Sequence, residues 1–273
     1  YKSDFKDFGA FCAKHGLSSL PSEPKIVSIY LTHLSKNSKI STIRRRLVSI
    51  SMVHKLKGHY LDTKHPIITE NLLGIKRVKG SIQRGKKPIL INHLKSIVNV
   101  IDEQKCEEIK RLRDRSIILI GFGGGFRRTE LISIDHEDLE FVPEGLKITI
   151  KRSKTDQFGE GMIKGLPYFS NEIYCPVTSL KRWLEVSKIK SGPIFRRFSK
   201  GSSLTEKRLT DQSVVLLMKE YLNLAGIENK NFAGHSLRAG FATVAAESGA
   251  DERSIMAMTC LLYTSPSPRD NRW

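Results

Sequence analysis

The sequence predicts a mainly α-helical protein with a small antiparallel β-sheet, an α+β chain of two domains joined by a basic linker. Apolar residues recur at helical spacing of three and four residues through most of its length. One stretch, 139–166, instead alternates apolar and polar residues around turn-forming residues, as hairpin strands do. The 273 residues are enough for two ordinary domains, each with its own core.

Residues 1–80 are expected to form a small helical domain. Gly16 and Gly58 are predicted to end the first and third helices, Ser22 and Pro24 to open the second, and Ser41 to cap the third. The residues expected to face the core in these three helices are Phe5, Phe8, Phe11, Cys12, Ile26, Ile29, Tyr30, Leu34, Ile43, Leu47, Ile50 and Leu56. A fourth helix is predicted from about Ile67 to Val78.

The third helix carries a row of cations on its predicted outer face. They are Arg44, Arg45, Arg46, Lys55 and Lys57. A solvated helix face is the ordinary interpretation of such a row. However, the chain has 46 Lys and Arg against 28 Asp and Glu, a net charge of +18, which points to a nucleic-acid partner. Phosphate contact is therefore the favoured role for this face.

Residues 79–88 have the composition of an interdomain linker, because they are polar, basic and interrupted by glycine. The cations Arg84, Lys86 and Lys87 suggest that this segment runs along a nucleic-acid backbone.

The second predicted domain spans residues 89–259. Asn92 is expected to cap its first helix, and a second helix is expected to break at Gly121, Gly123, Gly124 and Gly125. No Gly-Lys-Ser/Thr follows these glycines, which argues against a phosphate loop. Strands are predicted at 139–142 and 147–151 around Pro143-Glu144-Gly145, with a return strand near 162–166, and helices at about 176–188 and 210–226.

Four cations of this domain are candidate site residues. Arg127 opens a helix after the glycines, and Lys154 follows a strand. His235 and Arg238 are three residues apart, which places both on one face of a helix where they can meet one anionic group. Arginine offers a planar fork of donors to phosphate oxygens, and histidine offers a donor or a proton near neutral pH. Taken singly, each favours an ordinary interpretation: a surface arginine, a surface lysine or a hydrogen-bonded core histidine.

The contexts of these cations resemble, in order, the motifs of the tyrosine recombinases, or phage-type integrases. These contexts are Gly125-Phe126-Arg127-Arg128-Thr129-Glu130-Leu131, Arg152-Ser153-Lys154-Thr155-Asp156 and Gly234-His235-Ser236-Leu237-Arg238. The resemblance covers nearly all of residues 1–259 and implies a helical core-binding domain followed by a catalytic domain.

The resemblance also implies a role for each matched residue. Arg127, chosen over Arg128 by the Gly-x-Arg-x-x-Glu-Leu pattern, and Arg238 would hold the scissile phosphate. Lys154 would protonate the departing 5′ oxygen, and His235 would donate to the phosphate and manage protons. Glu130 would orient the arginines. A tyrosine would form a 3′-phosphotyrosyl link without metal or other cofactor. The implied partner is double-stranded DNA, bound by a homotetramer.

The expected nucleophile is missing from its place. The family pattern puts the tyrosine near position 270, where this chain has Asp270, and Tyr263 lies too close to the motif. Residues 260–273 resemble a translated sequencing adaptor. We therefore interpret them as a non-native tail on a chain truncated before its nucleophile, and predict that this fragment cannot cleave DNA.

Other function classes find little support in the sequence. The four cysteines lack zinc-type spacing and the histidines lack a ligand pattern, so we expect no metal. No apolar run is long enough to span a membrane and no signal peptide is visible, which predicts a cytoplasmic, nucleoid-associated protein in a bacterial or phage context. Two alternatives stay open: a DNA-binding protein with the same fold that does not cleave, and a type IB topoisomerase.

Overall fold

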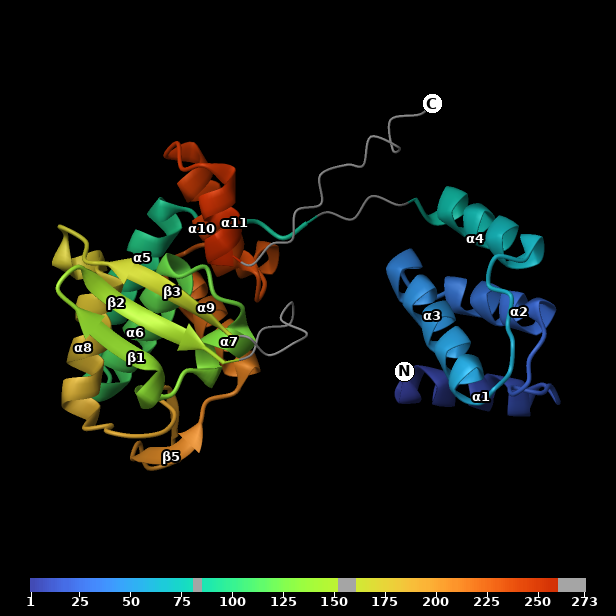
Figure 1. The fold of residues 1–273 in the computed structure, drawn as a ribbon, viewed down its shortest axis with the longest axis horizontal. Helices are drawn as coiled ribbons and strands as arrows, with labels where there is room; N and C mark the ends of the chain where they lie inside the picture. The colour runs from blue at the N-terminus through green and yellow to red at the C-terminus, as the bar shows by residue number, and fades with distance from the viewer. Residues whose placement is uncertain (81–84, 152–160, 260–273) are drawn as a thin grey trace. The chain divides into compact units, whose positions relative to one another are not determined.

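A computed structural model describes residues 1–80, 85–151 and 161–259. The chain divides into two compact units, Tyr1–Arg84 and Gly85–Trp273. The fold is mostly helical with small antiparallel sheets, which confirms the predicted class (Figure 1).

The first unit consists of α1 (Lys2–Lys14), α2 (Pro24–Ser35), α3 (Ile40–Leu56) and α4 (Pro66–Lys79). Pro24 and Pro66 begin α2 and α4, at the one helical position where a missing N–H costs nothing. Gly16 and Gly58 follow α1 and α3 with φ of 65° and 77°, a conformation that favours glycine and ends a helix. The core of this unit contains Phe8, Val27, Tyr30, Leu31, Ile43, Ile50 and Ile68.

Three predictions for the first unit were wrong. Ile29 is exposed because the buried stripe of α2 follows Val27, Tyr30, Leu31 and Leu34, and Ile29 lies outside that spacing. Leu56 is exposed in the last position of α3. Ser41 lies inside α3, whose N-cap is Lys39, and so caps nothing.

The second unit is built around α6 (Glu108–Gly123), which is buried on all sides from Ser116 to Phe122. Helices α5 (Ile91–Glu103), α8 (Pro176–Ser187), α9 (Asp211–Leu224) and α10 (Ser236–Glu247) pack against it. The remaining helices are α7 (Arg128–Ser133) and α11 (Glu252–Thr259), with short 3-10 turns at His136–Asp138, Glu172–Tyr174 and Asn229–Asn231.

The predicted three-stranded sheet is present. Strands β1 (Leu139–Val142), β2 (Gly145–Ile150) and β3 (Met162–Pro167) pair antiparallel in the order β1-β2-β3. Along β2, Leu146, Ile148 and Ile150 alternate inward, as their spacing predicts. A second hairpin, β4 (Arg196–Phe198) with β5 (Leu204–Arg208), was not predicted; its strands are short and mostly polar.

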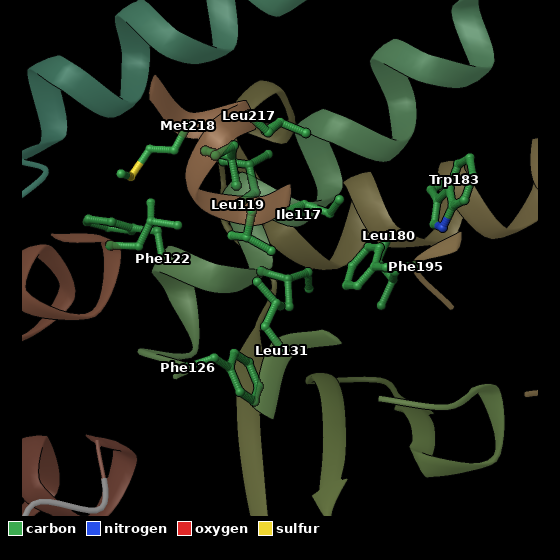
Figure 2. Packing of buried hydrophobic residues seen from close by; sticks show 14 of the residues in the cluster. Ile117, Leu119, Phe122, Phe126, Leu131, Leu180, Trp183, Phe195, Leu217 and Met218 are labelled. Carbon is green, nitrogen blue, oxygen red and sulfur yellow. The ribbon is translucent and has the colours of Figure 1, made fainter. Parts of the chain in front are cut away.

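The core of the second unit lies around α6. Figure 2 shows Ile117 and Leu119 of α6 among side chains of α8 and α9, with Phe126 and Leu131 at the end nearest the sheet. Trp183 is buried and donates its indole N–H to the carbonyl oxygen of Ile194 at 2.9 Å. This packing fixes α6, so that the turn following it is held on a rigid support.

Two expected helix signals in this unit act differently from the prediction. The N-cap of α5 is Leu90, not Asn92. Gly121 lies inside α6, whereas the helix ends at Gly123 with Gly124 as its C-cap, within the predicted run of glycines. A Cβ atom at Gly121 would lie 3.0 Å from Leu131 Cδ2 and 3.3 Å from a methyl carbon of Leu237. The absence of a side chain therefore lets α7 and α10 approach α6 closely.

Residues 85–89 pack on the start of α10, and we call this segment the basic strap. The backbone N–H of Lys87 donates to the carbonyl oxygen of Asn231 at 2.8 Å, and that of Ile89 donates to the carbonyl oxygen of Ser236 at 2.9 Å. A Cβ atom at Gly240 would lie only 1.9 Å from the carbonyl oxygen of Ile89, so only glycine fits there. The C-terminal half of the predicted linker is thus bonded to the second unit. Its role as a DNA-contacting linker stays a prediction.

Candidate functional site

The candidate site is organised by the turn Gly124–Arg127, which connects α6 to α7. Gly125 has φ of 53°, and a Cβ atom there would lie 2.8 Å from the ring of Phe241. Both constraints require glycine. Phe126 is buried, and the chain emerges at Arg127, the N-cap residue of α7. The predicted helix start at this point is confirmed.

Glu130 fixes Arg127 in two ways. Its Oε2 accepts the backbone N–H of Arg127 at 2.9 Å, which caps α7, and its Oε1 accepts from Arg127 Nη1 at 2.6 Å. Glu130 is 2% exposed, whereas the Arg127 side chain is 15% exposed. A buried carboxylate therefore forms a charge-assisted hydrogen bond with a guanidinium that still reaches solvent.

Arg238 reaches the same turn from a helix more than a hundred residues later. It lies in the first turn of α10, is buried, and donates from Nη1 to the carbonyl oxygen of Gly125 at 2.8 Å. Arg127 and Arg238 are thus both attached to this turn, Arg127 through the backbone and Arg238 through a hydrogen bond.

His235 is the N-cap residue of α10, and its side chain is exposed. The helix begins one residue later than the prediction assumed, so His235 precedes the helical face that carries Arg238. It nevertheless lies one turn before Arg238, on the same end of the helix.

Arg128, the neighbour of Arg127, contacts the loop that precedes His235 and lies near Asp211 of α9. Its guanidinium packs against the backbone of Gly234, where a Cβ atom would lie 2.3 Å from Nε, and Nη1 lies 3.6 Å from an oxygen of Asp211. Gly234 therefore provides the space that Arg128 fills. Of the paired arginines, Arg127 is the one that carries the salt bridge to Glu130.

Two candidate site residues, Lys154 and Arg84, fall outside the described residues, as does the predicted tail at 260–273 with Asp270 and Tyr263. Their predicted roles stay predictions.

Lys164 on β3 was missed by sequence reasoning. It is 0% exposed, although it is a lysine, and its Nζ donates to the carbonyl oxygen of Gly124 at 2.9 Å. The same atom lies 3.9 Å from Glu130 Oε2 and 4.3 Å from the centre of the Phe126 ring. A signal was available: Lys164 shares the inward face of β3 with Leu166, where an apolar residue would be expected.

The cations of α3 divide into two groups. Arg44, Lys55 and Lys57 are exposed, as predicted. Arg45 forms an ion pair with Asp4 but keeps 60% of its side chain exposed. Arg46 contradicts the predicted outward face, because it is 20% exposed and its Nη1 donates to a carboxylate oxygen of Asp7 and to the Tyr30 hydroxyl.

The carboxylates of α1 account for this division. Asp4 is buried, accepts from Arg45 and from Ser49, and the hydrogen bond from Arg45 lowers the pKa of its carboxyl group. These contacts tie α1 to α3. Part of the basic face therefore supports the fold of the first unit.

No cluster of three or more His, Cys, Asp or Glu side chains that could hold a metal ion occurs among residues 1–80, 85–151 and 161–259. Over the same described ranges, the helices are too short or too polar to cross a membrane.

A model of the Phage integrase family matches residues 89–259. The chain is 40% identical over 262 residues to an integrase/recombinase XerD homologue of Selenomonas ruminantium, an alignment that covers 95% of this chain and 76% of that protein. It is 27% identical over 183 residues to the tyrosine recombinase XerD of Staphylococcus haemolyticus, which covers 64% of this chain and 57% of the relative.

Solved structures share the fold. The Tn1549 transposon integrase in complex with transposon right end DNA aligns with a TM-score of 0.65 at 15% identity, over 94% of this chain and 84% of that one. The XerH site-specific recombinase bound to its difH substrate aligns with a TM-score of 0.61 at 13% identity, over 94% of this chain and 70% of that one.

Proposed function

Because the chain belongs to the phage integrase family, we propose that Arg127 and Arg238 bind the scissile phosphate of double-stranded DNA in a site-specific recombination reaction. In this reaction a tyrosine attacks the phosphate, forms a 3′-phosphotyrosyl link and releases a 5′ hydroxyl. Attack by the 5′ hydroxyl of a partner strand then rejoins the DNA.

The main support for the proposal is that both arginines are attached to the same turn between α6 and α7. Arg238 is bonded to Gly125, and Arg127 follows two residues later with its guanidinium held by Glu130. Charge on the phosphate oxygens increases in the pentacoordinate transition state. Guanidinium groups already fixed in place stabilise that charge without further reorganisation.

His235 and Lys154 are proposed to handle protons and the leaving group. His235 is exposed beside Arg238, where its imidazole can donate to a phosphate oxygen. Lys154 would protonate the departing 5′ oxygen, since an alkoxide leaving group needs a proton at neutral pH.

DNA contact is proposed for both units. Exposed Arg44, Lys55 and Lys57 on α3 would contact phosphates, as would Lys86 and Lys87 of the basic strap. The Tn1549 integrase and XerH structures contain DNA, which supports a DNA partner. We also propose a homotetramer acting on two duplexes at the nucleoid, in the cytoplasm of a bacterial cell.

A salt titration tests the DNA-binding part of the proposal. Binding of the chain to duplex DNA should weaken steeply as salt rises, because each neutralised phosphate releases counterions. Fluorescence anisotropy with a labelled duplex at several salt concentrations measures the slope. A flat response would contradict DNA contact through these cations.

A further inference from the structure

Lys164 is a fully buried lysine that contacts the turn to which both arginines are attached. It lies on β3 directly opposite Ile148 of β2, and both side chains are completely inaccessible. A buried ammonium group is costly unless it is paired and hydrogen-bonded. Its contacts with Gly124, Glu130 and Phe126 supply that compensation.

These contacts connect Lys164 to both proposed phosphate ligands. Lys164 donates a hydrogen bond to the carbonyl oxygen of Gly124, and Arg238 donates one to the carbonyl oxygen of the next residue, Gly125. Lys164 also lies near Glu130 Oε2, the oxygen that accepts the backbone N–H of Arg127. The turn between α6 and α7 is thus held by cations from β3 and α10.

We propose that Lys164 is a positioning residue for the phosphate site, acting on Arg127 and Arg238 through Glu130 and the Gly124 carbonyl group. The proposal rests on the proposed function of the two arginines. Without Lys164 the buried Gly124 carbonyl would lose its donor, and the Glu130 carboxylate would lose one of its neighbouring cations. The turn would then relax, and the guanidinium groups would no longer be fixed for an incoming phosphate.

Lys164 is not placed to act on DNA directly. Its side chain has no exposed surface, and its Nζ is directed at a backbone carbonyl group and an aromatic ring. This separates its role from that of Lys154, for which we propose proton donation.

The test uses the chain as it is and inorganic phosphate as the probe, with affinity followed by the ³¹P line width. Lys164→Met should weaken phosphate binding about tenfold, within the range of coupling between contacting residues. Lys164→Arg should recover part of the affinity. The control is Lys147→Met on neighbouring β2, because Lys147 is exposed and paired with Glu140; phosphate affinity should not change.

A double-mutant cycle with Arg127→Ala shows whether Lys164 acts through the arginine. In the Arg127→Ala background, Lys164→Met should lower the phosphate affinity only a little further. A folded Lys164→Met variant with wild-type affinity, or fully additive losses, would overturn the proposal. If Arg127→Ala alone leaves the phosphate affinity unchanged, the proposed phosphate site is wrong, and the proposal for Lys164 is wrong with it. If Lys164→Met does not fold, Lys164→Gln takes its place in the same cycle, with the same outcomes.

Discussion

Arg238 Nη1 lies 2.8 Å from the carbonyl oxygen of Gly125, and this hydrogen bond joins the start of α10 to the turn that presents Arg127. Two guanidinium groups far apart in sequence are thereby attached to one short segment of backbone. We propose that donors held in this way stabilise the transition state without further reorganisation.

The first prediction concerns this pair in an enzyme with its nucleophile restored. Arg238→Ala should lose about 3 kcal/mol or more of transition-state stabilisation, the scale for a preorganised donor. DNA affinity should hardly change, because many other cations remain. Single-turnover cleavage rates and a binding titration on the same variant separate the two effects.

Arg127 and Arg128 provide a matched comparison for the same assay. Arg127→Ala should abolish cleavage because Glu130 holds this guanidinium beside the shared turn. Arg128→Ala should retain cleavage, since Arg128 packs on Gly234 and lies near Asp211. The reverse result would show that the wrong arginine of the pair has been assigned to the phosphate.

The second prediction separates two arginines of α3. Arg44→Ala should weaken DNA binding and reduce the magnitude of the slope of log affinity against log salt by about one unit, as expected for one lost phosphate contact. Arg46→Ala should mainly lower the stability of the first unit, because it removes the contacts to Asp7 and Tyr30. If both variants changed the salt slope equally, the division of the basic face would be wrong.

The third prediction is a pH dependence of the first unit. The hydrogen bond from Arg45 lowers the pKa of Asp4 in the folded state, so the ionised carboxylate stabilises the fold. That stability is fully present above the unfolded pKa of aspartate, about 3.9, and is lost as the pH falls through the lower folded value. The protection of the amides of α1 and α3, measured as their exchange rate relative to the intrinsic rate at each pH, should fall in this acid range.

Asp4→Asn is the control for this pH dependence. It removes the titrating group, so it should reduce stability near neutral pH and flatten the acid dependence of exchange in α1 and α3. An unchanged acid dependence in this variant would assign the effect to other carboxyl groups.

Local sequence patterns accounted for much of the fold. The alternation of Leu146, Ile148 and Ile150 predicted β2, and Gly16 and Gly58 predicted two helix ends. These signals act within a few residues, where backbone sterics decide the outcome. The exposed position of Leu56 could not be predicted in the same way, because it depends on whether another element covers the end of α3.

The candidate site shows the same limit. The spacing of His235 and Arg238 and the motif around Arg127 identified cations, but not their partners. The inward position of Lys164 and the contacts of Arg46 with Asp7 and Tyr30 arise from tertiary packing. The position of Lys164 at an inward-facing place of a predicted strand was a usable signal. However, a basic chain contains many lysines, and only the burial seen in the structure distinguishes Lys164 from the others.

We propose that Arg127 and Arg238 form a DNA-cleaving phosphate site, and that position 270, where the family pattern expects the tyrosine, is occupied by Asp270. Grafting a tail with Gly-His after Thr259 and a tyrosine nine residues past that histidine should restore the nucleophile at the spacing the family pattern requires. Proximity of a positioned nucleophile supplies much of the rate of such a step.

The most direct measurement is covalent trapping on a suicide DNA substrate, resolved on a denaturing gel. We expect no adduct with the chain as written, an adduct with the grafted tail, and loss of that adduct when Arg127→Ala is added. An adduct formed by the chain as written and lost on Tyr263→Phe would contradict the proposal that the chain as written lacks a nucleophile.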